Sequence, residues 1–111
     1  MSSPTTWLPA NSLVNTNKLD PRLKTFLERA GEAHWALFRS PLVVTSGNDS
    51  THVAGSAHYW DKAIDLRSRD LSDSGALIML IILVNLGLEF GVAVFDERLK
   101  PDGPHFHCEI L

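Results

Sequence analysis

The sequence has a single cysteine, Cys108, among 111 residues, so no disulfide can form within the chain. Its N-terminus lacks the basic start and apolar block of a secretory signal peptide, which predicts synthesis in the cytoplasm. The longest apolar run, Ala76–Val84, is nine residues, whereas a membrane-spanning helix needs about 20. With a formal net charge of -3 and no basic cluster, the chain is expected to bind neither nucleic acid nor a membrane.

The composition is that of one folded domain. The chain is 44% hydrophobic, which is enough for a single core at this length. Residues 1–18 are rich in Ser, Thr, Asn and Pro and are expected to form an extended N-terminal arm. Residues 19–111 are expected to form the single domain, as a monomer.

The first predicted helix spans Asp20–Phe38. Asp20 is a good N-cap, and Pro21 suits the first helical position, where a missing N–H costs nothing. The apolar side chains at helical spacing predict the buried face, which comprises Leu23, Phe26, Leu27, Ala30, His34 and Leu37. We interpret His34 as a partly buried histidine with a hydrogen-bond partner rather than as a metal ligand.

The second predicted helix, Gly75–Leu88, is apolar nearly all round. Asp70, Ser72 and Asp73 precede it, as a helix N-terminus prefers. Such a helix is expected to be a deeply packed core element. Gly87 and Gly91 are expected to break it.

The remaining apolar segments are short and predict strands. They are Pro41–Thr45, Lys62–Arg67, Val92–Phe95 and His105–Ile110. The predicted fold is therefore α+β, with a small antiparallel sheet packed against the two main helices.

Histidines and one aspartate form the candidate site. In the last predicted strand His105 and His107 share one face, while Cys108 points with the apolar residues and is expected to be a buried hydrophobe rather than a nucleophile. His58 precedes Asp65 by seven residues, a spacing that suits a loop histidine folding back over a strand carboxylate. Two imidazoles and one carboxylate with an open fourth position are the ligand set of a catalytic zinc ion.

These motifs resemble the D-Ala-D-Ala carboxypeptidase and hedgehog-type zinc peptidase family, in particular its small phage and bacterial members. The family pattern is Ser-x-His, four residues, Ala-x-Asp and a C-terminal His-x-His, which Ser56, His58, Ala63, Asp65, His105 and His107 match. The resemblance covers about Leu42 to Ile110. It implies a sheet that carries a Zn2+ site and a zinc metallopeptidase that hydrolyses bacterial wall peptides.

The resemblance also implies a role for each site residue. His58, Asp65 and His107 would bind the metal, and Glu97 would be the general base, with Asp96 and Asp102 as alternatives. A glutamate that ends a strand paired with His105–Ile110 can reach the open zinc position, and His105 can stabilise the oxyanion. Asp61 or Glu109 would hydrogen-bond to the metal-binding side chains and orient them without binding the metal.

The substrate side of the site departs from the family pattern. Many members carry an arginine in the turn after the first strand, in a form like TSGYRS, whereas this turn reads TSGNDS. A cation is the natural partner of a carboxylate, so Arg67, Arg39 or a protonated His52 would take its place. Ser56, His52 and Arg67 are the predicted substrate-binding residues, and Asp61 stands where the family often has glycine.

The expected substrate is a peptidoglycan stem peptide, cut at D-Ala-D-Ala or at an internal bond such as L-Ala-D-Glu. The alternative is a non-catalytic domain of the same fold in which zinc stabilises a binding surface. A third alternative is a metal-free binding domain, in which the His and Asp constellation is a coincidence. An enzyme made in the cytoplasm would reach the wall after lysis or by an export route that the sequence does not reveal.

Overall fold

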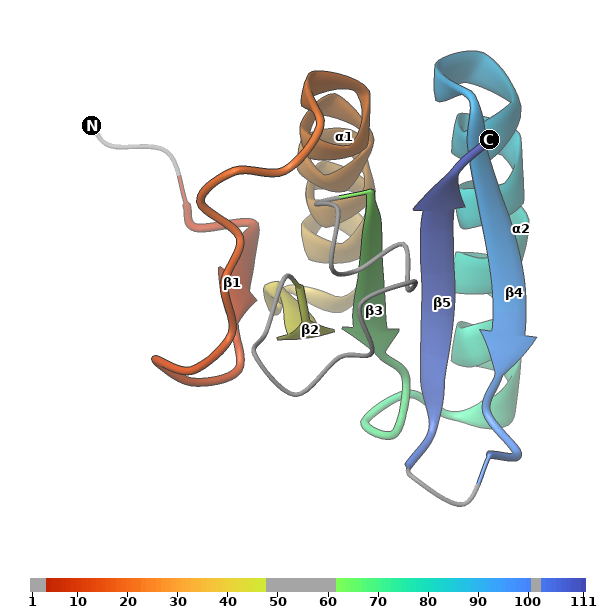
Figure 1. Cartoon of the computed structure of the whole chain (residues 1–111). Coiled ribbons are helices and arrows are strands. Elements are labelled where there is room, and N and C mark those ends of the chain that lie inside the picture. Colours follow the sequence, from red (N-terminus) through yellow and green to blue (C-terminus); the bar gives the residue numbers. More distant parts are fainter. Residues whose placement is uncertain (1–3, 48–61, 101–102) are drawn as a thin grey trace.

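The computed structural model describes residues 4–47, 62–100 and 103–111. These residues form an α+β fold in which one five-stranded sheet packs against two helices (Figure 1). In chain order the elements are β1 (Trp7–Pro9), α1 (Pro21–Phe38), β2 (Leu42–Ser46), β3 (Ala63–Arg67), α2 (Asp73–Phe90), β4 (Val92–Glu97) and β5 (His105–Ile110).

The sheet is mixed, with the strand order β1-β2-β3-β5-β4. The expectation of an antiparallel sheet is correct for β2, β3, β5 and β4 but wrong for β1, which pairs with β2 in parallel. Strand β1 lies within the segment expected to be an arm, and its three residues ending at Pro9 carry no strand pattern that would have predicted it.

Helix α1 begins and ends where the sequence predicts. The Asp20 carboxylate accepts a hydrogen bond of 3.0 Å from the Arg22 amide, and Pro21 occupies the first helical position. His34 is buried and donates from Nδ1 to the Ser40 carbonyl oxygen at 2.7 Å, which confirms its structural interpretation. Leu37, expected on the buried face, is half exposed, and Phe38, the next residue, packs against the core in its place.

Helix α2 is longer and less buried than predicted. Ser72 caps it by accepting from the Gly75 amide at 3.1 Å, and Gly91 ends it in the left-handed region at φ 73°. Gly87 does not break the helix. A Cβ there would collide with the Val92 carbonyl oxygen, so glycine lets α2 approach β4 closely.

The expectation that α2 is a deeply packed core element is correct for one side of the helix only. Only one side packs against the sheet and α1, through Gly75, Ala76, Met79, Leu83 and Gly87. The opposite side exposes large apolar side chains, namely Leu77, Ile78, Ile81, Val84 and Leu88. By length and composition alone α2 could cross a membrane, but core helices meet the same criterion.

The core fills the layer between the sheet and the helices. Ile64 and Leu66 on β3 and Phe106 and Cys108 on β5 are fully buried there. The prediction that Cys108 points into the core is confirmed. Burial raises the pKa of its thiol, because a thiolate would lose its hydration there.

Phe106→Ala tests the core. We expect it to lower the free energy of unfolding by about 3–5 kcal/mol, because a fully buried aromatic ring is replaced by a cavity. Phe95→Ala on the adjacent strand is the matched control, since Phe95 is 47% exposed and its loss should cost much less. Urea unfolding of both variants measures the difference, and equal costs would contradict the assigned strand faces.

Candidate active site

The sheet face opposite the helices carries the candidate site. Side chains alternate along a strand, and those of Ile64, Leu66, Phe106 and Cys108 point into the core, so their neighbours point the other way. Directly paired residues share a face, so the register between β3, β5 and β4 assembles two rows of side chains across these strands. The first row is Asp65, His107 and Phe95. The second row is Arg67, His105 and Glu97. We call these six residues and Glu109 the polar face.

Carboxylates and imidazoles alternate across the polar face. Glu97 Oε1 lies 2.9 Å from His105 Nε2, which lies 3.8 Å from Asp65 Oδ1. The same Asp65 oxygen lies 2.8 Å from His107 Nδ1. His107 Nε2 in turn lies 3.2 Å from Glu109 Oε1. Side chains that are 42 positions apart in the sequence are thereby in direct contact.

His107 contacts a carboxylate at each ring nitrogen. Only the imidazolium form can donate at both positions at once. The hydrogen bond to Asp65 accordingly raises the pKa of His107, assisted by the charges of Asp65 and Glu109 and opposed by burial. His107 also lies against the Phe95 ring, with a centroid distance of 5.8 Å.

His105 is held from both sides. Its Nδ1 donates to the Gly103 carbonyl oxygen at 2.9 Å, because a carbonyl can only accept. The contact between Nε2 and Glu97 therefore needs one more proton, either on the ring or on the carboxyl group. The His105 side chain is 11% exposed and that of Glu97 is 26% exposed, so this contact is largely shielded from solvent.

The three acids considered for the general base lie in different places. Glu97 is on the polar face, next to His105. Asp96 is on the opposite face of β4, where both of its oxygens accept from Arg98 at 2.8 Å, and this contact lowers the pKa of Asp96. Asp102 lies outside the described residues, as does Asp61.

Arg67 borders a cavity of about 230 Å3 beside the polar face. Thr45, Gly103, Pro104, His105 and Arg69 also line it. Arg67 Nη1 lies 3.7 Å from Asp70 Oδ2, a long contact that leaves the guanidinium able to bind another anion. Arg69 was not predicted, although it follows Asp65 and Arg67 at the same two-residue spacing. His52 and Ser56 lie outside the described residues.

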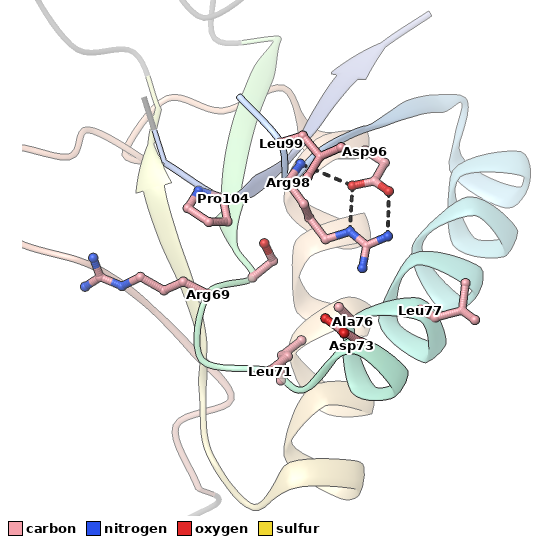
Figure 2. A pocket seen from close by; sticks show the side chains of 10 residues that line it. Arg69, Leu71, Asp73, Ala76, Leu77, Asp96, Arg98, Leu99 and Pro104 are labelled. Atoms are coloured by element: carbon pink, nitrogen blue, oxygen red, sulfur yellow. Dashed lines mark hydrogen bonds and ion pairs between the residues drawn. The ribbon is translucent and has the colours of Figure 1, made fainter. Parts of the chain in front are cut away.

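A second cavity, of about 640 Å3, lies near the start of α2 (Figure 2). Figure 2 shows Asp96 and Arg98 paired in its wall, with Asp73 and Leu77 on α2 nearby. Asp96 and α2 are on the helix side of the sheet, so this cavity is separate from the polar face. Arg69 and Pro104 line both the 640 Å3 cavity and the 230 Å3 cavity.

The donor atoms on the polar face suit part of a zinc site. Asp65 Oδ1 and His107 Nδ1 are 2.8 Å apart, and a carboxylate oxygen and a neutral imidazole nitrogen are atom types that zinc binds. The Glu109 carboxylate at His107 Nε2 matches the outer contact that commonly orients a metal-bound histidine. His58, the third predicted ligand, lies outside the described residues. Among the residues described, no group of three or more such side chains is arranged to hold a metal.

Sequence comparison identifies no relative. The chain matches no protein-family model and no curated protein. The resemblance to the zinc peptidases therefore rests on the Ser-x-His, Ala-x-Asp and His-x-His motifs.

The raised pKa of His107 predicts a pH dependence of stability without metal. A raised pKa in the folded state stabilises the fold fully below the unfolded pKa of about 6.5, and this contribution is lost as the pH rises through the folded value. We expect the stability of His107→Gln not to fall in this way as the pH rises, because glutamine does not titrate. Urea unfolding of both proteins in a chelator across this window gives the difference, and parallel pH profiles would contradict the Asp65–His107 interaction.

Proposed function

We propose that this protein is a zinc-dependent peptidase that hydrolyses a bond of a peptidoglycan stem peptide. The observation that carries the proposal is the contact of Asp65 with His107 beside the His105–Glu97 pair on one sheet face. This face offers two metal ligands, a carboxylate for proton transfer and an imidazole for a developing charge.

Asp65, His107 and His58 would hold the metal. Zinc bound there would polarise the peptide carbonyl and lower the pKa of a bound water toward about 7. Glu109 would keep His107 oriented by accepting from Nε2.

Glu97 is the proposed general base. Its carboxylate accepts a proton as the water oxygen bonds to the carbonyl carbon, and it returns that proton to the amine nitrogen as the C–N bond breaks. His105 holds Glu97 in place through Nε2 in the free protein. With substrate bound, the same N–H can donate to the carbonyl oxygen as negative charge develops on it.

The cavity beside His105 is the proposed substrate-binding region. Stem peptides carry free carboxylates, and Arg67 and Arg69 line this cavity. Arg67 thereby retains its predicted role, with Arg69 added to it. Ser56 and His52 remain predicted substrate contacts.

The test is mass spectrometry of defined stem peptides incubated with the zinc-loaded protein. Loss of one alanine would identify a D,D-carboxypeptidase, and a cut within the stem would identify an endopeptidase. Zinc binding without any cleavage would contradict the peptidase and favour the non-catalytic zinc-stabilised binding domain. A protein without zinc would contradict both.

A further inference from the structure

The two helices of the same layer have different outer faces. Helix α1 presents charged side chains to solvent, namely Arg22, Lys24, Glu28, Arg29 and Glu32. Helix α2 has no charged residue between Asp73 and Glu89, and its outward side exposes Leu77, Ile78, Ile81, Val84 and Leu88 by between 43% and 81%. A continuous apolar strip of this kind marks an interaction surface.

The spacing of the strip specifies the shape of its partner. Leu77, Ile81, Val84 and Leu88 follow one another at intervals of four, three and four residues. This is the narrow seam with which one helix packs along another, as in coiled coils. The partner that the strip fits is therefore another helix with an apolar seam.

We propose that this partner is α2 of a second copy, packed antiparallel along the seam about a two-fold axis. The intervals of four, three and four read the same in both directions, so an antiparallel copy places an apolar side chain opposite every apolar side chain of the seam. Antiparallel packing places Leu77 of one copy opposite Leu88 of the other and Ile81 opposite Val84. The protein thus forms a dimer rather than the monomer expected from the sequence.

The charges of α2 lie at its two ends. Antiparallel packing brings Glu89, in the last turn of one α2, toward the N-terminal end of the other α2, where the helix dipole is positive and Asp73 is negative. The exposed strip between these ends has no charged residue. A second copy that packs on the strip therefore buries no unpaired charge.

A lipid surface fits this helix less well. Helices that lie on membranes carry lysine and arginine on their polar face, whereas α2 has Asp73 in its first turn and no basic residue in its last. Crossing a membrane would require α2 to leave the fold, in which Met79 and Leu83 are fully buried.

The size of the strip predicts a reversible dimer. At 18 residues α2 is about 27 Å long and, with side chains, about 10 Å wide. One helix face is smaller than the roughly 800 Å2 per partner of a standard stable interface. We therefore expect exchange between monomer and dimer in the micromolar range. Figure 1 shows α2 on one side of the sheet, and the polar face is on the other side, so the seam and the polar face do not overlap.

Sedimentation equilibrium over a range of protein concentrations tests the dimer. The mass should rise from 12.3 kDa toward twice that value. Ile81→Lys should weaken association about tenfold or more, because it places a charge at the centre of the seam. Leu13→Lys, at a leucine that is 82% exposed outside α2, should behave like the parent.

Circular dichroism establishes that each variant is folded. A parent that remains a monomer at every concentration would overturn the proposal, as would an Ile81→Lys dimer of parental affinity. A monomeric parent that sediments with phosphatidylcholine vesicles would overturn it in favour of a lipid surface.

Cross-linking tests the orientation. An equal mixture of Ile81→Cys and Val84→Cys should form a disulfide-linked heterodimer on mild oxidation, because the two positions face each other in an antiparallel pair. Each variant alone should link far more slowly. Rapid linking of Ile81→Cys to itself would overturn the antiparallel arrangement. Cys108 does not interfere, because it is buried.

Discussion

Glu97→Gln should lower the turnover of stem-peptide hydrolysis by about 10²–10⁴-fold while zinc binding persists. The amide keeps the size of the carboxyl group but cannot accept the proton of the attacking water, and a positioned general base contributes an acceleration of this order. Because Glu97 contacts His105 rather than Asp65 or His107, its replacement leaves the proposed ligands in place. Rates on a defined stem peptide and the zinc content of the same sample give the two readouts.

Asp96→Asn is the matched control for that result. It makes the same chemical change one residue earlier, on the opposite face of β4, where Asp96 pairs with Arg98. We expect turnover to be nearly that of the parent. An active Glu97→Gln would show that Glu97 is not the base, and Asp102 would be tested next.

Asp65→Asn should weaken zinc binding by more than about 100-fold and abolish hydrolysis. Removing a group that only orients a ligand already costs 10–100-fold in metal affinity or activity, and Asp65 is a proposed ligand itself. In the metal-free protein the variant should also lower the pKa of His107, because the hydrogen bond and the charge that raise it come first from Asp65. Competition with a zinc chelator and an NMR titration of the His107 ring measure the two effects.

Asp70→Asn is the control for this variant, since Asp70 is an exposed carboxylate in the same segment that pairs with Arg67. It should retain zinc binding. If Asp65→Asn instead binds zinc with parental affinity, the ligand set is wrong. Glu97 and Glu109, the other carboxylates on the polar face, would then be the acids to replace.

Local signals in the sequence predicted much of the fold. The Asp20-Pro21 start located α1, and the alternation of His105–Ile110 put both histidines on one face and Cys108 on the other. Strand β1 was missed because its pairing with β2 depends on the path of the chain through α1 rather than on its own three residues. The exposed side of α2 was missed because a helix that is apolar all round does not reveal which side meets the core.

The candidate site was only partly predictable for a similar reason. Sequence motifs selected Asp65 and His107, but their contact depends on the register between β3 and β5. The choice between Asp96 and Glu97 depends on which residues of β4 face the core, and the run Val92–Phe95 is apolar on both faces. Phe95 and Arg69 carry no motif, so only the folded chain brings Phe95 to the polar face and Arg69 to the cavity beside it.

Strand β5 is hydrogen-bonded on both sides, to β3 and to β4, whereas β1 and β4 form the edges of the sheet. Backbone amides in such a central strand exchange with solvent only through openings that approach global unfolding. His105, His107 and Glu109 therefore lie on the part of the chain that stays closed while edges and loops open. Glu97, at the end of the edge strand β4, lies instead on a part of the sheet that is hydrogen-bonded to a neighbouring strand on one side only.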